Sequence, residues 1–298
     1  MSRGVHELRE PTLRPVERGA AAVEDRPIGR ILVDLRKLRE RDLARVLEVQ
    51  RKKRMRFGET ACKLGLVEEA DVYYALSIQF NYPYVGRDPA SLGPDLIAAH
   101  DPYHAQSEAL REVRTQLITH WLGPQRKVLA VTSAGVGEGK SYLAANLAVS
   151  FAQMGEKTLL IDADLRAPRQ HRIFGLGNAA GLAQVLARRA GLEAAECSGY
   201  FDSLSVLPAG AAPPNPLELL SRGEWPRVLL EARRQYTLVL VDTAADVCGS
   251  DARLVAARAD GALLVARKHR TRLEALARMR SAITASGVPV VGTVLNQA

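Results

Sequence analysis

The 298-residue sequence is poor in cysteine and in aromatic residues, and it has no long apolar run. Its three cysteines, Cys62, Cys197 and Cys248, have neither the spacing of a metal site nor that of a disulfide framework, so we expect reduced thiols. No stretch approaches the ~20 apolar residues that span a bilayer, and the start of the chain lacks the apolar core of a signal peptide. These absences exclude a small disulfide-bonded secreted domain and favour a cytoplasmic protein.

The formal net charge of +8 is spread along the chain. A nucleic-acid-binding protein usually gathers its basic residues in one stripe, so we expect no nucleic acid as a partner. The densest basic run, at residues 51–56, has the sequence Arg-Lys-Lys-Arg-Met-Arg. A solvated helix end accounts for this run better than a binding patch does.

A phosphate-binding loop is the strongest signal in the sequence. Residues 133–142 have the sequence Ser-Ala-Gly-Val-Gly-Glu-Gly-Lys-Ser-Tyr and lie between an apolar run and a helical pattern. Glycines let backbone N–H groups converge on phosphate oxygens, and a helix N-terminus adds partial positive charge. We expect Lys140 to reach the β- and γ-phosphates and Ser141 to bind Mg²⁺. Ala134 replaces the first glycine of the strict pattern, but the flanking strand and helix favour a phosphate loop over an ordinary glycine-rich turn. The loop residues predicted to bind nucleotide are Gly135, Gly137, Glu138, Gly139, Lys140, Ser141 and Tyr142.

Three aspartates follow predicted strands. Asp162 and Asp164 come at the end of the apolar run 158–161, and Asp242 follows the run 238–241. Ligands of open parallel sheets bind at the carboxyl ends of the strands, where a carboxylate typically holds Mg²⁺ directly or through water. Each aspartate alone fits a helix N-cap. Three of them beside a phosphate loop favour a metal–nucleotide site.

The alternation of strands and helices predicts an α/β fold, a doubly wound and mostly parallel sheet, preceded by a small mainly helical domain. Residues 1–25 are expected to be a flexible tail, 26–84 the helical domain, 85–104 a linker rich in proline, and 105–298 the P-loop domain. The predicted strands are 127–132, 157–161, 237–241, 262–266 and 289–294.

Several motifs beyond the loop point to one family. Residues 162–171, Asp-Ala-Asp-Leu-Arg-Ala-Pro-Arg-Gln-His, together with Gly-Glu-Gly-Lys-Ser at 137–141, resemble the bacterial tyrosine kinases. Further matches lie at 207–210, 213–220 and 241–244, so the resemblance covers roughly 104–298. It is nearest to exopolysaccharide chain-length determinant kinases of the EpsG type. The family usually has a proline where this chain has alanine at position 244.

The resemblance implies an ATP- and Mg²⁺-dependent protein tyrosine kinase that regulates exopolysaccharide polymerisation, export and chain length. Its implied partner is a membrane-embedded chain-length co-polymerase, which would place this chain at the inner membrane from the cytoplasmic side. Around Mg²⁺ the family places residues that correspond to Ser141, Asp164 and Asp242. Asp162 is the candidate to orient or deprotonate the attacking tyrosine hydroxyl, because a phenol with a pKa of ~10 benefits from a nearby carboxylate base.

The same resemblance implies roles for two further residues, one in catalysis and one in nucleotide binding. Arg166 is expected to stabilise the transferring phosphate or to contact a neighbouring subunit, and both roles stay open. Asn296 follows a predicted strand at the place where related P-loop proteins often contact adenine.

Assembly is predicted from Glu108, Arg111 and Arg114, which lie at i, i+3 and i+6 on the expected helix 106–122. Glu-x-x-Arg-x-x-Arg at this place resembles the motif through which family members form homo-oligomeric rings. A surface pair worth ~0.2–0.5 kcal/mol is the alternative. The family's C-terminal tyrosine cluster is missing, since no tyrosine follows Tyr236.

The helical domain contains two 24-residue copies, 27–50 and 56–79, at an offset of 29 residues. They resemble the cyclic-di-GMP-binding domain at the N-terminus of MshE-type secretion ATPases. The residues predicted to contact cyclic-di-GMP are Gly29, Arg56, Gly58 and Gly65. Arginine pairs with guanine and glycine lets backbone approach a ligand. In the first copy Pro27 replaces the arginine and Arg36 replaces the later glycine, so a protein-interaction module is the alternative.

Two other functions remain open for the whole chain. A MinD/ParA-like positioning or partition ATPase would usually have a second lysine early in the loop, where this chain has Gly135. A regulatory adaptor with weak kinase activity is favoured by the absence of the C-terminal tyrosines.

Overall fold

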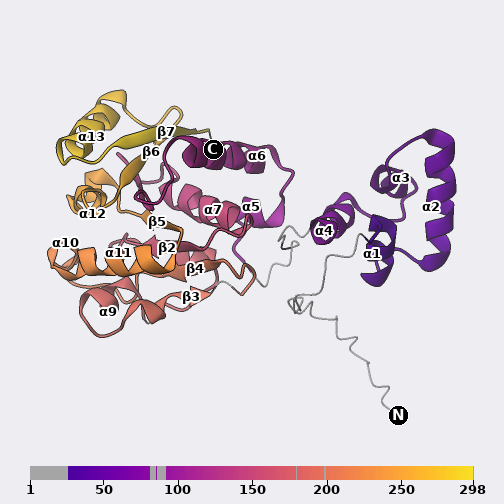
Figure 1. The fold of residues 1–298 in the computed structure, drawn as a ribbon. Helices are drawn as coiled ribbons and strands as arrows, with labels where there is room; N and C mark the ends of the chain where they lie inside the picture. The colour runs from indigo at the N-terminus through magenta and orange to yellow at the C-terminus, as the bar shows by residue number, and fades with distance from the viewer. Residues whose placement is uncertain (1–25, 81–84, 86–91, 179, 198, 298) are drawn as a thin grey trace, which may run out of the picture.

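The computed structural model describes residues 26–80, 85, 92–178, 180–197 and 199–297. They form a helical domain, drawn in indigo and purple in Figure 1, and an α/β domain that contains all the strands. The tail predicted at 1–25 lies outside the described residues. No helix within the described ranges has both the length and the apolar character needed to cross a bilayer.

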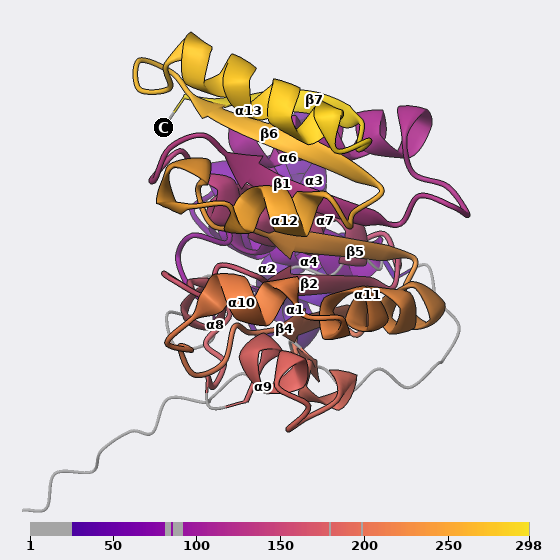
Figure 2. The ribbon, with the colours of Figure 1, turned by 90° about the vertical axis from the view of Figure 1, so that its left-hand side faces the viewer.

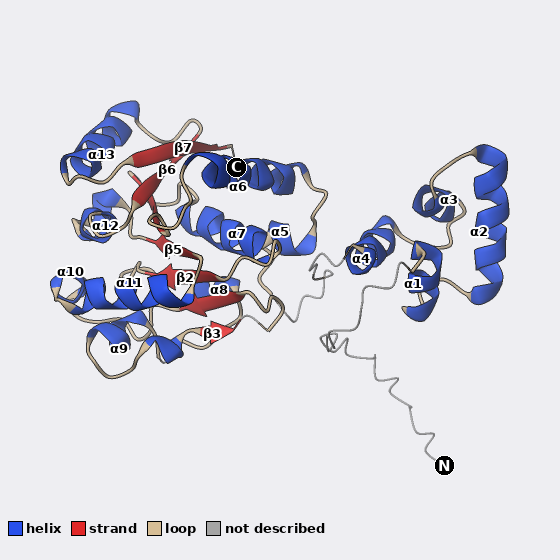
Figure 3. Ribbon diagram, viewed as in Figure 1, coloured by secondary structure: helices blue, strands red, loops and turns tan. Residues whose placement is uncertain are grey.

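The helical domain contains α1 (Ile28–Asp34), α2 (Glu40–Lys53), α3 (Phe57–Lys63) and α4 (Glu69–Gln79). Figure 3 shows helices and loops here, and no strand among the residues described, so the predicted helical character is confirmed. Helix α3 begins 29 residues after α1, and α4 begins 29 residues after α2, which is the offset of the sequence repeat. The core of this domain is built from apolar side chains of all four helices and their connecting turns.

Gly29 and Gly58 occupy equivalent positions near the start of α1 and α3, and both are buried. A Cβ on Gly29 would lie 2.6 Å from Leu43 Cδ1, and one on Gly58 would lie 2.4 Å from Val72 Cγ1. Leu43 and Val72 are themselves equivalent in the repeat. The space beside these glycines is filled by the domain's own side chains, so close helix packing is what requires glycine at both positions.

The α/β domain has one seven-stranded sheet of order β3-β4-β2-β5-β1-β6-β7, with only β3 antiparallel to its neighbour. This confirms the predicted doubly wound, mostly parallel sheet. The five predicted strands correspond to β1, β2, β5, β6 and β7; β4 is short and β3 shorter still, and neither has the apolar run that identifies the others. The strands are β1 (Val128–Ser133), β2 (Thr158–Asp162), β3 (Glu196–Cys197), β4 (Leu204–Leu207), β5 (Leu238–Asp242), β6 (Gly261–Arg267) and β7 (Val290–Asn296).

Helices cover both faces of the sheet because successive strand residues point to opposite sides. Leu129 and Val131 of β1 pack in one apolar cluster with α6 and α7, whereas Val128 and Ala130 pack with helices of the other face. In Figure 2 the helices α9 to α13 lie in front of the sheet and α6 and α7 behind it. The helices of the α/β domain are α5 (Ile97–His100), α6 (Ala105–His120), α7 (Lys140–Ala152), α8 (Gln170–Ile173), α9 (Leu182–Leu186), α10 (Pro216–Ser221), α11 (Glu224–Gln235), α12 (Asp251–Ala256) and α13 (Leu273–Ala285), with short 3-10 turns η1 (Leu192–Ala194) and η2 (Asp246–Cys248).

Part of the segment expected to be a linker belongs to the α/β domain. Leu92 and Leu96 are buried in the cluster that includes α7. The buried side chain of Asn146 accepts a hydrogen bond from the Ala98 N–H at 2.9 Å and donates one to the Asp95 carbonyl at 2.8 Å. The packed α/β unit therefore begins by Leu92, in front of the predicted boundary at residue 105.

Candidate active site

The loop between β1 and α7 forms a phosphate cradle at the carboxyl edge of the sheet. Gly137 and Gly139 have φ values of +73° and +98°, a region that side chains with a Cβ rarely enter. The Ser133 hydroxyl donates to the Gly135 carbonyl at 2.9 Å, which closes the start of the loop. Helix α7 then begins at Lys140 with its N-terminus at the loop. The backbone thus has the form that a phosphate-binding loop needs.

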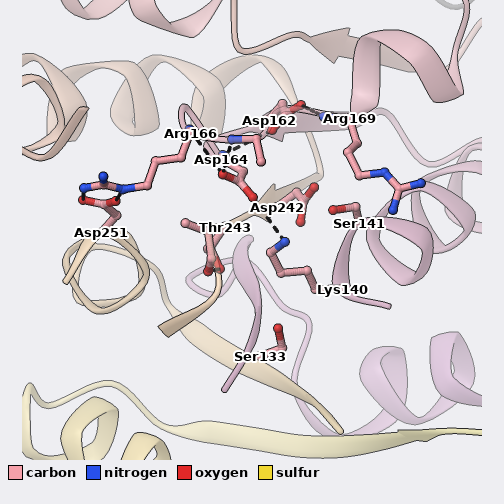
Figure 4. A network of polar contacts seen from close by, with 12 residues as sticks. Ser133, Lys140, Ser141, Asp162, Asp164, Arg166, Arg169, Asp242, Thr243 and Asp251 are labelled. Carbon is pink, nitrogen blue, oxygen red and sulfur yellow. Dashed lines mark hydrogen bonds and ion pairs between the residues drawn. The ribbon is translucent and has the colours of Figure 1, made fainter. Parts of the chain in front are cut away.

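Lys140 extends from the first turn of α7 into a group of carboxylates (Figure 4). Its Nζ lies 3.2 Å from Asp164 Oδ2, and both side chains are nearly buried. Burial lowers the pKa of Lys140, but the neighbouring carboxylates of Asp242, Asp164 and Asp162 outweigh it and raise the pKa. The ammonium therefore keeps its charge where an anionic phosphate would bind.

Asp162 is fully buried at the end of β2 and shapes the loop that follows it. Its Oδ1 accepts a hydrogen bond from the Asp164 N–H at 3.2 Å, and its Oδ2 accepts from the N–H groups of Arg169 and Gln170 at 3.0 and 2.9 Å. Burial, and then repulsion by Asp242, raise the pKa of Asp162 to about 8. The residue predicted as the base is thus also the anchor of residues 164–170.

Asp242 lies at the end of β5, directly beside Asp162 in the parallel register. Its Oδ2 accepts a hydrogen bond from Gln170 Nε2 at 2.8 Å, whereas its Oδ1 is buried without a partner among the described residues. Burial raises the pKa of Asp242, against the opposing effect of Lys140. A buried carboxylate oxygen without a donor costs free energy unless a cation or water meets it.

The residue types fit Mg²⁺. Ser141, Asp164 and Asp242 offer hard oxygen ligands beside the phosphate cradle, and Asp242 Oδ1 has no protein partner in the described part of the chain. No cluster of three or more His, Cys, Asp or Glu side chains with the arrangement of a protein-only metal cage occurs in the described ranges. Mg²⁺ usually takes only one or two carboxylates and completes its shell with water and substrate phosphates.

Gln170, the first residue of α8, was not expected at this site. It is fully buried, and its Nε2 donates to the Ser141 carbonyl at 3.1 Å as well as to Asp242. Gln170 lies within the 162–171 motif that resembles the kinase family, but glutamine is most often a surface residue, so the sequence alone assigned it no role.

Arg166 extends away from Lys140 in Figure 4 and pairs with Asp251 at the start of α12. Its Nε contacts Asp251 Oδ2, and its Nη2 lies 3.4 Å from Asp251 Oδ1. Asp251 is nearly buried. In this arrangement the arginine ties the loop after β2 to α12, so contact with a transferring phosphate requires the pair to open.

The phosphate loop is also held from the ends of β6 and β7. Asn296, at the end of β7, was predicted to contact adenine; its Nδ2 instead donates to the Glu138 carbonyl of the loop at 3.2 Å. Thr271 Oγ1 donates to the buried Glu138 carboxylate at 2.6 Å, and Arg267 Nη1 donates to the Gly137 carbonyl at 3.1 Å. These contacts were not anticipated, since they join positions more than 100 residues apart in the sequence.

Tyr142, predicted to bind nucleotide, turns toward α6. Its hydroxyl donates to Gln106 Oε1 at 3.2 Å. Burial, and then the charge of Asp95, raise the pKa of Tyr142, so its hydroxyl stays protonated as a donor.

The predicted assembly residues lie on α6, away from the carboxylates. Arg111 Nη2 lies 2.5 Å from Glu108 Oε1, and this hydrogen bond lowers the pKa of Glu108. Arg114 Nη1 donates to the Ser150 carbonyl at 2.7 Å and to the Ser150 hydroxyl at 3.1 Å, which ties α6 to α7 within one chain. The structure therefore shows local contacts for both arginines.

Comparisons with known proteins show a nucleotide-binding domain and relatives named as tyrosine kinases. Residues 129–297 match the model of the CobQ/CobB/MinD/ParA nucleotide binding domain. Tyrosine-protein kinase YwqD of Bacillus subtilis is 39% identical over 202 residues, which cover 68% of this chain and 85% of that protein. Putative tyrosine-protein kinase CapB of Staphylococcus aureus is 33% identical, with 66% and 87% covered. Tyrosine-protein kinase wzc of Salmonella typhimurium is 32% identical, but the match spans only 28% of that longer protein.

Solved structures give the same answer for the fold. The kinase domain of Escherichia coli tyrosine kinase ETK superposes with a TM-score of 0.66 at 32% identity, covering 71% of this chain and 83% of that one. The cell division ATPase MinD of Pyrococcus furiosus superposes with a TM-score of 0.51 at 26% identity, covering 57% and 71%.

Proposed function

The chain belongs to the bacterial tyrosine-protein kinase family, and from that premise we propose that it transfers the γ-phosphoryl group of ATP to tyrosine hydroxyls of proteins at the site between β1, β2 and β5. The observation that carries the proposal is the convergence of Lys140 and Asp164 on the phosphate loop beside Asp242, whose buried Oδ1 has no protein partner in the described ranges. Phosphoryl transfer depends mainly on positioning and on neutralising charge, and this constellation supplies both.

Each residue has a distinct role in this reaction. Bound Mg²⁺, held by Ser141, Asp164 and Asp242, would neutralise phosphate charge. Lys140 binds the phosphates, because its raised pKa keeps the ammonium protonated. In the metal-free site burial and Asp242 raise the pKa of Asp162 to about 8, so its side chain is protonated near neutral pH. Bound Mg²⁺ would lower this pKa and so leave Asp162 as the carboxylate that accepts the phenolic proton.

Phosphotyrosine analysis of the purified protein with Mg·ATP tests the proposal, with and without the cytosolic segment of a co-polymerase partner. We expect phosphotyrosine on the chain or on the partner, and none with the Lys140→Met protein. Absence of phosphotyrosine under both conditions, with ATP still hydrolysed, would leave the nucleotide-switch function that the likeness to MinD supports.

We propose that the biological role is regulation of exopolysaccharide polymerisation, export and chain length with a membrane-embedded co-polymerase. Support comes from the motif resemblance to chain-length determinant kinases across 104–298. Co-purification with that partner, in cells that make the polysaccharide, would test it; an unchanged polymer length after deletion of the kinase would contradict the role.

Ring formation through Glu108, Arg111 and Arg114 remains a proposal of the same kind. Because Arg114 also binds Ser150 within the chain, the double variant Arg111→Ala, Arg114→Ala needs a thermal-unfolding control beside the sedimentation profile. Loss of oligomers with an intact fold supports an interface. An unchanged profile in the presence of nucleotide reduces the motif to local helix support.

Cyclic-di-GMP as ligand of the helical domain is supported by the repeat and by the exposed Arg56, which precedes α3. Gly29 and Gly58 are accounted for by helix packing, so they no longer support the ligand. Calorimetry tests whether the full chain binds cyclic-di-GMP and whether the Arg56→Ala protein binds it more weakly. No heat at tens of micromolar would make the domain a protein-interaction module.

A further inference from the structure

Gln170 connects three parts of the site although it carries no charge. Its Nε2 donates to Asp242 Oδ2 at 2.8 Å and to the Ser141 carbonyl at 3.1 Å. Its backbone N–H donates to Asp162 Oδ2 at 2.9 Å. The side chain is fully buried, and its Oε1 has no hydrogen-bond partner among the described residues. Gln170 therefore joins the end of β5 to the first turn of α7 through its side-chain amide, and the end of β2 through its backbone N–H.

The two oxygens of Asp242 differ because of this contact. Oδ2 accepts from the amide, whereas Oδ1 has no donor within the described part of the chain. A neutral donor holds the carboxylate in one orientation without the positive charge that would compete with a metal ion. Lysine or arginine at position 170 would neutralise the same carboxylate and so weaken cation binding.

We propose that Gln170 is a positioning residue of the metal–nucleotide site. Its amide holds the Asp242 carboxylate against the turn that carries Ser141, so that Oδ1 of Asp242 and the hydroxyl of Ser141 serve one Mg²⁺. A water bound in the same site would satisfy the buried Oε1 and remove the cost of leaving this acceptor unpaired. This inference rests on the proposed function, because it assigns a role within that metal site.

A purely structural role makes a different prediction. If Gln170 only fastened the 164–170 loop to the sheet, its loss would lower thermal stability without metal and would weaken ADP binding equally with and without Mg²⁺. A positioning residue instead changes the factor by which Mg²⁺ tightens ADP binding.

The experiment compares Gln170→Met and Gln170→Asn with the wild-type protein. Methionine removes the donor at similar volume, and asparagine keeps an amide that is one methylene too short to bridge both acceptors. The matched control is Gln153→Met: Gln153 is also buried, and its Nε2 also donates to a backbone carbonyl, that of Ala98 at 2.9 Å, at the far end of α7. Calorimetry measures the ADP affinity of each full-length protein in EDTA and in Mg²⁺, and thermal unfolding in EDTA reports the fold.

We expect both Gln170 variants to lose roughly 10- to 100-fold of the Mg²⁺-dependent gain in ADP affinity, as is typical when a partner of a metal ligand is removed. Their affinity for metal-free ADP should change little, and Gln153→Met should keep the full gain. If the wild-type protein bound ADP with the same affinity in EDTA and in Mg²⁺, that result would contradict the proposed function itself. Two results would overturn the role of Gln170 alone. Either both Gln170 variants keep the full Mg²⁺-dependent gain in ADP affinity, or Gln153→Met loses as much of that gain as they do.

Discussion

In the α/β domain Gly137 and Gly139 have positive φ values, so the backbone of the phosphate loop itself requires glycine, whereas in the helical domain Gly29 and Gly58 lie inside helices and only the packing of neighbouring side chains requires glycine. Carboxylates differ in the same way. Asp162 and the other carboxylates of the site are buried at one sheet edge, while the helical domain buries apolar side chains and keeps its acidic residues exposed or half-buried.

The difference shows what each domain is built to hold. Burying several like charges costs free energy, and the cost is recovered when a cation and a phosphate enter. The helical domain carries no such cost, since its buried Thr60 and Ser77 hydroxyls donate to carbonyls of their own helices. Bound Mg²⁺ and nucleotide should therefore stabilise the α/β domain strongly and leave the stability of the helical domain unchanged.

The largest expected effect is that of Lys140→Met on phosphoryl transfer. The change removes the cation that meets the phosphates, so the rate should fall by at least ~100-fold, the loss typical of removing one preorganised electrostatic contact. Lys53→Met in the helical domain, where Lys53 is exposed, is the control and should leave the rate unchanged. If phosphotransfer assays gave equal rates for the wild-type and Lys140→Met proteins, the assignment of the active site to the loop of Lys140 would be wrong.

In the absence of metal, the stabilities of the two domains should depend on pH in different ways. The pKa of Asp162, raised to about 8 by burial and by Asp242, lies above that of an unfolded-chain aspartate, near ~3.9. Between these values the folded state holds the extra proton. The free energy of unfolding of the α/β domain should therefore fall as pH rises from about 5 to about 8, by a few kcal/mol at most, and level off above.

The helical domain should not follow this trend. The pKa values of its Glu48 and Glu59 are lowered by Lys52 and Lys63, so their contribution is lost only when pH falls toward the acid range. Calorimetric unfolding in EDTA from pH 5 to pH 8.5 measures both transitions, and Mg·ADP should suppress the pH dependence of the α/β domain. A flat α/β profile in EDTA would contradict the buried-carboxylate interpretation.

Substituting glycine by alanine should affect nucleotide affinity in the α/β domain and folding stability in the helical domain. Gly139→Ala forces a Cβ into the left-handed region and to 2.2 Å from Asn296 Nδ2, so nucleotide affinity should fall by ~10-fold for a backbone cost of ~1–2 kcal/mol. Gly58→Ala should leave that affinity unchanged. It should cost the helical domain up to ~2 kcal/mol, because overpacking against Val72 outweighs the ~1 kcal/mol gained in helix propensity.

A double-mutant cycle sharpens this prediction. Val72→Ala makes room for the new methyl group, so Gly58→Ala should cost less, or become stabilising, in the Val72→Ala background. Additive effects of the two substitutions in denaturant unfolding would show that the glycine is not required by this contact.

The smallest effects concern the equivalent turns of the two repeats. Gly65 and Arg36 have φ values of +66° and +58°, and both are exposed. Relief of backbone strain predicts that Arg36→Gly stabilises the helical domain by up to ~1 kcal/mol and that Gly65→Ala destabilises it by a similar amount. Denaturant midpoints of the two proteins should shift in opposite directions; shifts of the same sign would count against this explanation.

Much of the α/β domain was predictable because its signals are local. The five apolar strands, the glycine loop with Lys140 and Ser141, and the aspartates at the ends of β2 and β5 depend on patterns a few residues long, and parallel strands bring their carboxyl ends to one edge. The short β4 was missed because four residues carry too little pattern, and the packed start of the domain was missed because prolines around Leu92 favoured a linker.

The sequence by itself determined the fold class, the phosphate loop and which strand ends carry charge, because backbone geometry and apolar periodicity act between near neighbours. Only the tertiary structure decided that Gln170 joins Asp242 to the turn of Ser141, that Arg166 pairs with Asp251, and that Gly29 and Gly58 serve packing. Those contacts join residues far apart in the chain. Their energies depend on burial and distance, which exist only after the helices and strands have packed.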